Sequence, residues 1–353
     1  AAGNGSHVFF WNNAKSRTPG DTDPTWTSVN LGGPIEHRCL AISDDGNYLV
    51  AGGTGPNVFY WDNAKGRTGT EETTTWDAWV NDLVEAVDLS SNGNYVVAGF
   101  GTNVSYWKGA TSLTGHHLGG TAPPPDWTSA KPNINDHIND VAVSDDGNYV
   151  AAAGGAGPSP VYYWANAKSL SDNPPTTWES ASGVDFSSID MSSNGDSVIA
   201  GAFGPGLENL GVYFWDGART RSGTEDWSWH YVTAGGVCDV AINDAGDYMA
   251  AANAVAQPHF VYFFDNRGNS LWNPPYQVDY AVRSLSISSD GGTLAVGTVG
   301  GDSGFLFNTG YPVKPVGGIL IPADKLALLS PWIALALTAV AVTVFAAKRR
   351  RKA

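Results

Sequence analysis

The sequence predicts an all-β fold assembled from repeated sheets. A phrase that centres on a tight turn, usually Asp-Gly or Asn-Gly, recurs six times, and its glycines lie 45 to 54 residues apart. Short runs that alternate large apolar residues with small or polar ones flank each copy, which is the period of a half-buried strand. Repetition at this spacing is typical of units that stack or form a ring. The turns lie at Gly46, Gly93, Gly147, Gly195, Gly246 and Gly291.

Each unit carries four predicted strands. The first, as in residues 141–144, precedes the turn, where Gly accepts a positive φ and lets two strands pair tightly. The second, as in 48–52, follows the turn, and the third is aromatic, as in Val-Phe-Tyr-Trp at 58–61. The fourth is weaker and carries a tryptophan: Trp26, Trp76, Trp127, Trp178, Trp227, and Trp272 or the region of Tyr276. Four antiparallel strands per unit predict the blade of a β-propeller, whereas a β-sandwich would not repeat one phrase at one period.

The units resemble WD-repeat and quinoprotein-like β-propellers. Trp61-Asp62 and Trp215-Asp216 stand where a WD dipeptide would, at the end of the third strand. The Gly-His dipeptide of WD repeats is missing, so the resemblance does not carry over their Asp–His–Ser–Trp hydrogen-bond network. The phrase Ser-Asp-Asp-Gly-Asn-Tyr at 144–149 also resembles propellers of archaeal secreted proteins. The resemblance covers residues 1–307 and implies a fold rather than an activity.

The number of blades has two solutions. The aromatic third strand occurs seven times if residues 8–11 and 304–307 are included, but the first strand occurs only six times. We expect seven blades, with the strands that open the first blade and close the last one lying upstream of residue 1 in a precursor. The alternative is six blades, in which the Trp26 strand closes the last one.

The C-terminus predicts a membrane anchor. Residues 326–347 are uncharged, and five of the last six residues are basic. At 1.5 Å per residue this segment would form a helix of about 33 Å, which is enough to cross a bilayer, with the basic end in the cytoplasm. The expected organisation is an extracellular propeller at 1–307, a tether at 308–325, a single-pass transmembrane helix at 326–347 and a basic cytoplasmic tail at 348–353. Residues 315–331 resemble the anchors of archaeal surface proteins, and the small residues Ala1-Ala2 fit a signal peptide already removed.

The charge balance narrows the choice of partners. The chain has a formal net charge of −15, and the part outside the basic tail is more acidic still. An acidic surface argues against nucleic acid, because phosphate binding needs Lys and Arg. It favours solubility, cations or basic partners.

We find no motif for catalysis, a cofactor or a metal. The chain lacks HExxH, GxSxG, P-loop and dinucleotide-binding signatures. His116 and His117 are neighbours in a predicted loop. Cys39 and Cys238 fall in first strands of separate units, so we do not expect them to bond to each other. The chain is therefore expected to be non-enzymatic and to need no cofactor.

Three sets of positions are candidates for binding or modification. First strands line the channel of a propeller, and the residues at the start of these strands differ between units. A polar channel mouth would vary in this way, and so would any position near a loop. The positions are Arg38, Glu85, Asn139, Ser187, Cys238 and Arg283. The long loops 12–25, 62–75 and 108–125 share a face with the Gly turns, and related Lys-bearing phrases suggest an interaction face at Lys15, Lys65 and Lys168. Asn4 and Asn103 begin glycosylation sequons.

The sequence therefore favours a membrane-anchored surface propeller that is a binding or structural module of a cell-envelope or membrane-protein assembly. Its expected partners are other surface or membrane proteins, further copies of itself, surface glycans, and the lipid bilayer through residues 326–347. The alternatives are a propeller enzyme or ligand binder that uses the channel mouth, and an accessory subunit of a membrane complex.

Overall fold

The computed structural model describes residues 2–4, 6–13, 23–33, 39–53, 55–117, 121–130, 137–155, 159–181, 184–203, 210–253, 258–299 and 304–311. Residues 1–312 form one compact unit and residues 313–353 a second one. The predicted transmembrane helix and basic tail, and all of the tether after residue 311, lie outside the described residues. In the part of the chain that the structure describes, no helix is long and apolar enough to span a bilayer.

The described strands form seven sheets, which we number along the chain. Sheet 1 has β1 (Ala2–Asn4), β2 (His7–Phe10) and β3 (Trp26–Ser28), and β7 (Gly69–Glu72) joins its edge. Sheet 2 has β4 (Leu40–Ile42), β5 (Leu49–Ala51), β6 (Asn57–Trp61) and β8 (Trp76–Trp79). Sheet 3 has β9 (Val84–Leu89), β10 (Tyr95–Phe100), β11 (Asn103–Lys108) and β12 (Trp127–Ala130).

The remaining sheets repeat this plan. Sheet 4 has β13 (His137–Val143), β14 (Tyr149–Gly155), β15 (Val161–Ala165) and β16 (Trp178–Ser180), and β20 (Gly223–Glu225) joins its edge. Sheet 5 has β17 (Asp185–Met191), β18 (Ser197–Phe203), β19 (Gly211–Asp216) and β21 (Trp229–Val232). Sheet 6 has β22 (Val237–Ile242), β23 (Tyr248–Asn253), β24 (His259–Asp265) and β25 (Tyr276–Val278), and sheet 7 has β26 (Ala281–Ile287), β27 (Thr293–Val299) and β28 (Gly304–Asn308).

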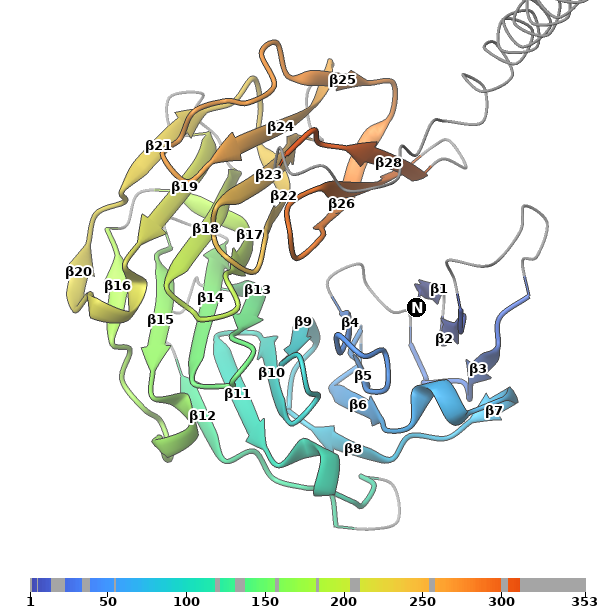
Figure 1. Ribbon diagram of the computed structural model, residues 1–353. Helices are drawn as coiled ribbons and strands as arrows, with labels where there is room; N and C mark the ends of the chain where they lie inside the picture. The colour runs from blue at the N-terminus through green and yellow to red at the C-terminus, as the bar shows by residue number, and fades with distance from the viewer. Residues whose placement is uncertain are drawn as a thin grey trace, which may run out of the picture. The chain divides into compact units, whose positions relative to one another are not determined.

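The sheets follow one another in sequence order, as a propeller-like fold requires. Within each sheet the successive strands of a unit are antiparallel neighbours. The first strands of consecutive sheets contact each other from β4 to β26, and Figure 1 shows β9, β13, β17, β22 and β26 on the inner side of their sheets. The repeated phrase in the sequence therefore corresponds to one sheet, and the predicted all-β architecture is confirmed.

One predicted strand is displaced by two residues. We expected Trp227 on the fourth strand of its unit, but that strand is β21 and begins at Trp229, which pairs with Phe214. Trp227 is 41% exposed. In the next unit β25 begins at Tyr276, and Trp272 comes from the preceding loop to pack between Phe263 and Phe307.

The tryptophans of the fourth strands hold neighbouring sheets together. Each packs against a third-strand aromatic residue of the next sheet, with ring centroids 5.8 to 6.1 Å apart: Trp26–Trp61, Trp76–Trp107, Trp127–Trp164, Trp178–Trp215 and Trp229–Phe264. The same indoles donate a hydrogen bond to the backbone of the following sheet, at the carbonyls of Ala64, Ala110, Ala167, Ala218 and Asn266. Each of these tryptophans thus stabilises its junction both by burying an apolar ring and by satisfying the indole N–H group.

Tyrosines of the third strands add a second bond between sheets. The hydroxyls of Tyr60, Tyr106 and Tyr163 donate to the carbonyl oxygens of Gly93, Gly147 and Gly195 at 2.7 to 2.8 Å. Each acceptor is the glycine of the tight turn in the next sheet, and it has a positive φ. Most aromatic residues that recur in the sequence are therefore used for packing between sheets.

The loop between the third and fourth strands reaches back onto the preceding sheet. It pairs in parallel with the fourth strand there, as β7 does with β3 and β20 with β16. In sheet 3 the same loop makes a single bridge, between Gly115 and Trp76 of β8. This strap over the outer edge of the preceding sheet positions the residues of the candidate site.

Candidate functional site

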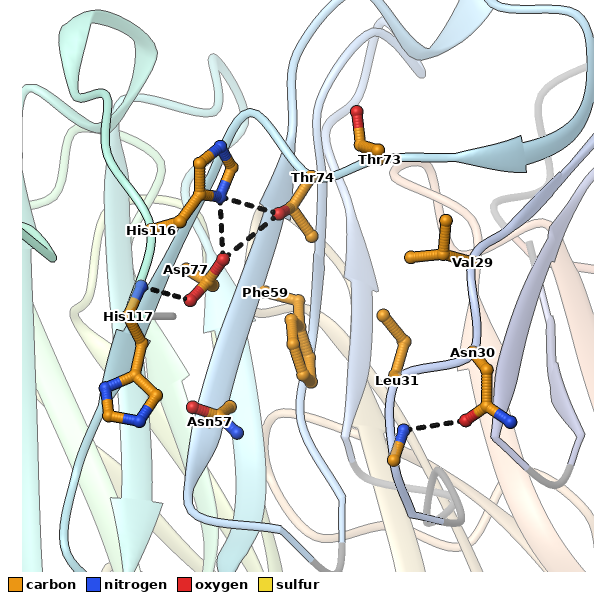
Figure 2. Close-up of a pocket in the computed structure, with 11 residues that line it drawn as sticks. Val29, Asn30, Leu31, Asn57, Phe59, Thr73, Thr74, Asp77, His116 and His117 are labelled. Atoms are coloured by element: carbon orange, nitrogen blue, oxygen red, sulfur yellow. Dashed lines mark hydrogen bonds and ion pairs between the residues drawn. The ribbon is translucent and has the colours of Figure 1, made fainter. Parts of the chain in front are cut away.

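A cavity of about 450 Å³ lies between the outer parts of sheets 1 and 2 (Figure 2). Sheet 1 contributes the segment after β3, sheet 2 contributes β6, β8 and the residues before β8, and the strap of sheet 3 contributes two histidines. The lining residues are Val29, Asn30, Leu31, Gly32, Asn57, Phe59, Thr73, Thr74, Asp77, His116 and His117. Three successive repeats therefore build one site.

Asp77 organises the polar wall of this cavity. Its Oδ2 lies 2.7 Å from Nδ1 of His116 and accepts a hydrogen bond from the Thr74 hydroxyl at 3.3 Å. Its Oδ1 accepts the backbone N–H of His117 at 2.7 Å. The Asp77 side chain is 15% exposed and that of His116 is 47% exposed. The carboxylate is thus occupied by donors from its own chain, and His116 is held by one ring nitrogen.

The opposite wall and the base of the cavity are apolar. Phe59 and Asp77 are direct cross-strand partners on β6 and β8, so their side chains share one face of sheet 2. That face turns toward sheet 1, where Val29 and Leu31 line the other side (Figure 2). At the start of β6, the Asn57 side chain has a buried oxygen without a hydrogen-bond partner among the described residues.

Backbone geometry brings the histidines to Asp77. Gly109 and Gly115, on either side of the 3-10 turn Ala110–Ser112, have positive φ values of 71° and 114°. A Cβ at position 115 would collide with the carbonyl oxygen of Thr121, so only glycine fits there. The bridge from Gly115 to β8 then places the next two residues beside Asp77.

The sequence singled out the two histidines but not their partners. They do not form a pair of ligands, because His116 bonds Asp77 while the ring of His117 packs edge-on against Trp79, 4.5 Å between centroids. The described residues contain no group of three or more His, Cys, Asp or Glu side chains that could hold a metal ion. A repeated Thr-x-Trp-acid pattern was the available signal for Asp77, since Thr176 likewise donates to Glu179 at 2.7 Å.

The predicted channel-mouth positions share a different feature. Arg38 lies outside the described residues, and the other five each occupy a bulge in the first strand: Glu85, Asn139, Ser187, Cys238 and Arg283. Three of them donate to a backbone carbonyl of the next sheet, Asn139 to Phe186, Ser187 to Val237 and Cys238 to Val282. Their polar atoms serve the junctions between sheets. The thiol of Cys39 likewise donates to a backbone carbonyl of the next sheet, that of Val84.

Carboxylates bind the inner strands together. Asp88 and Asp190 accept the N–H groups of Val143 and Ile242 in the next sheet. Asp140 and Asp239, two residues earlier in their own strands, accept those of Ile189 and Leu285. The carboxylates therefore alternate between two levels from sheet to sheet, which separates like charges.

Burial changes the protonation of these inner carboxyls. Burial raises the pKa of Asp88 to about 7, and the nearby Asp140 and Asp145 add to the rise, while two backbone N–H groups oppose it. Burial likewise raises the pKa of Asp190 well above its ordinary value. The inner lining thus holds one carboxyl group, that of Asp88, which takes up a proton near neutral pH.

The predicted interaction face is occupied in part by local contacts. Lys168 lies 3.7 Å from Asp146 of its own Gly turn and over the ring of Tyr95. Lys65 is exposed on the equivalent 3-10 turn, Ala64–Gly66, and Lys15 lies outside the described residues. Of the two sequon residues, Asn103 is half-buried at the start of β11, and Asn4 lies on β1.

Comparisons with known proteins agree with this fold. A family model for the WD domain, G-beta repeat, matches residues 32–62, which end at the predicted Trp61-Asp62 dipeptide. No match was found among curated proteins. The chain is similar to the solved beta-propeller domain of Cps50 (Swd1) from Myceliophteria thermophila, with a TM-score of 0.58 and 12% identity over 83% of this chain and 87% of that one. These similarities support an all-β propeller of the WD-repeat type.

Proposed function

We propose that this chain is a non-enzymatic, membrane-anchored propeller of seven blades that acts at the cell surface as a binding or structural module of a larger assembly. Seven sheets and the similarity to WD-type propellers, which generally serve as scaffolds for protein interaction, support the module. The uncharged segment 326–347, followed by basic residues, supports the anchor. The resemblance to archaeal surface proteins supports the cell-envelope setting.

The observation that carries this proposal is a group of exposed apolar side chains at one end of the sheets. First strands begin there, and second and fourth strands end there, so we call it the entry face. Five large apolar residues that are 41 to 56% exposed lie at these strand ends: Trp79, Leu83, Phe203, Val232 and Tyr280. Five of the nine large apolar side chains that are exposed among the described residues thus lie at this face, which favours it as the surface for protein contact.

The opposite face offers less free surface for a partner. It carries the Gly turns and the 3-10 turns, where cations meet acidic residues of the same chain, as Lys168 meets Asp146 and Arg219 meets Asp196 at 3.1 Å. These exposed ion pairs are worth little to the fold, but they occupy the charges that a partner would use. We therefore place the contact on the entry face rather than around Lys65.

Purification of the full chain from native membranes tests this proposal. Leu83→Ser with Phe203→Ser should reduce the recovery of co-purifying chains, measured by mass spectrometry, by about tenfold, because each change removes apolar contact area. Lys65→Glu with Lys168→Glu is the matched control on the opposite face and should leave recovery unchanged. Loss of partners only in the lysine variant would move the contact to that face. Recovery of the wild-type chain alone would contradict the proposal.

A further inference from the structure

We propose that the cavity between sheets 1 and 2 binds a neutral saccharide, with the sugar ring against Phe59 and its hydroxyl groups directed to Asn57, Thr74 and His116. This inference is independent of the protein contact on the entry face, because it rests on a different set of residues. The size of the cavity, about 450 Å³, lies within the range of small-molecule sites.

The apolar part of the cavity has the shape that a sugar ring needs. Phe59 is half-buried, and Val29 and Leu31 face it from sheet 1 (Figure 2). In sheet 5 the equivalent residue, Tyr213, is enclosed by Phe186 and by a stacked His230 4.1 Å away. Phe59 instead contacts the tilted ring of Trp61, with centroids 6.3 Å apart, and no ring stacks on it among the described residues, so its face is open to the C–H face of a pyranose.

The polar part supplies hydrogen-bonding groups that are mostly neutral. The oxygen of Asn57 is buried and has no partner among the described residues, and this costs free energy that a small rotation of the side chain toward a donor in the cavity would recover. The hydroxyls of Thr73 and Thr74 and the imidazole of His116 line the same cavity. Amide, hydroxyl and imidazole groups beside an aromatic face suit a ligand that carries several hydroxyl groups.

The charges of the site exclude the two ionic alternatives. Asp77 already accepts three donors from its own chain, so it has little capacity left to hold an ammonium group. A carboxylate in the wall and a strongly acidic chain both disfavour an anionic ligand. These charges favour a neutral ligand, and the aromatic face beside several hydrogen-bonding groups favours a saccharide among the neutral classes.

The test is a titration of the full chain, kept in a detergent without a sugar headgroup, by isothermal calorimetry and ligand-observed NMR. The probes are maltose, lactose and the methyl glycosides of glucose, galactose and mannose, with glucuronate and glucosamine as charged comparators. We expect saturable binding of at least one neutral probe and weaker binding of both charged ones. Binding of neither kind, or equal binding of charged and neutral probes, would overturn the inference.

Variants locate the binding. Phe59→Leu keeps apolar volume but removes the flat ring, and Asn57→Leu removes the buried acceptor, so each should weaken binding by about tenfold or more. Glu179→Gln is the matched control, because Thr176 and Glu179 repeat the hydroxyl–carboxylate pair of Thr74 and Asp77 elsewhere. Asn57→Leu should not lower the melting temperature, which separates lost binding from lost folding. Unchanged binding in both cavity variants, or equal loss in the control, would contradict the site.

Discussion

The junction between sheets 1 and 2 and the junction between sheets 4 and 5 share a buried tryptophan pair, which we call the inner half of the junction because it is closed to solvent. They differ at the neighbouring cross-strand pair, which we call the rim. Both have a tryptophan pair and an indole bond to a 3-10 turn, made by Trp26 in one and Trp178 in the other. At the rim, the cross-strand pair is Phe59 with Asp77 in the first and Tyr213 with His230 in the second. The histidine stacks on its partner and fills the space, whereas the shorter aspartate draws in His116 and leaves a cavity. The repeat thus sets the inner half of each junction and leaves the rim free to acquire a site.

The largest effect is expected at the inner half, and it should be equal at the two junctions. Trp26→Ala and Trp178→Ala each remove a buried indole and its hydrogen bond, so each should lower the free energy of unfolding by about 3–5 kcal/mol. Urea unfolding followed by circular dichroism measures the loss. A cost at one junction more than twice that at the other would break the equivalence.

The rim should respond unequally. Tyr213→Leu removes a ring that is 3% exposed and stacked on His230, and it should cost about 2 kcal/mol. Phe59→Leu at the open rim should cost less than about 1 kcal/mol, because leucine retains most of the limited burial. Thermal unfolding of the two variants against the wild type decides this. Equal costs would mean that the rim of sheet 2 is as well packed as that of sheet 5.

The stability of the fold should also depend on pH, through Asp88 on the first strand of sheet 3, at the junction between sheets 3 and 4. Its pKa of about 7 in the folded chain is higher than in the unfolded chain, so the folded state holds this proton more tightly. Asp88 therefore makes its full contribution to the free energy of unfolding below about pH 4, and this contribution is lost as the pH rises through 7. In Asp88→Asn the decline between pH 5 and 8 should be smaller by about 1–2 kcal/mol, since Asp88 as a whole residue is half-buried and nearby solvent weakens the effect.

Melting temperatures of both proteins across this range measure the difference. The raised pKa of Asp190 should leave a residual slope in the variant. An unchanged slope in Asp88→Asn would show that this carboxyl is ionised in the folded chain at pH 5.

A small effect is expected for the tyrosine bond between sheets 4 and 5. Tyr163→Phe removes the hydroxyl that donates to Gly195 but keeps the ring, so it should cost about 1 kcal/mol. Tyr60→Phe, which loses the same bond to Gly93, provides the comparison. Differential scanning calorimetry resolves a change of this size, and no loss in either variant would show that this bond adds no stability to the junctions that contain it.

The repeat made the sheets predictable but not their fine register. The six Gly turns and the aromatic third strands located the sheets, because a period near 50 residues survives substitution at single positions. Trp227 and Trp229 are two residues apart, so either could place its side chain on the same face of the fourth strand. Only the pairing of Trp229 with Phe214 distinguishes them. The bulges at Asn139 and Ser187 interrupt the alternation, because the buried Ile138 and Phe186 stand three residues before Val141 and Ile189 instead of two.

The candidate site was less predictable, for a different reason. Asp77 and His116 are 39 residues apart and belong to different repeats. Their contact depends on the path of the loop between them, which the positive φ of Gly109 and Gly115 directs. A pattern search within one repeat cannot find a site that three repeats share.

The straps formed by β7, β20 and Gly115 have a consequence for solubility. The fourth strand is the outermost of its sheet, and an open strand edge invites pairing with another molecule and aggregation. β3, β8 and β16 each have part of that edge occupied by a parallel segment from the following sheet. Sheets 2, 3 and 5 thus shield the edge of the sheet before them, which leaves less open strand edge for pairing between copies of this aromatic-rich protein.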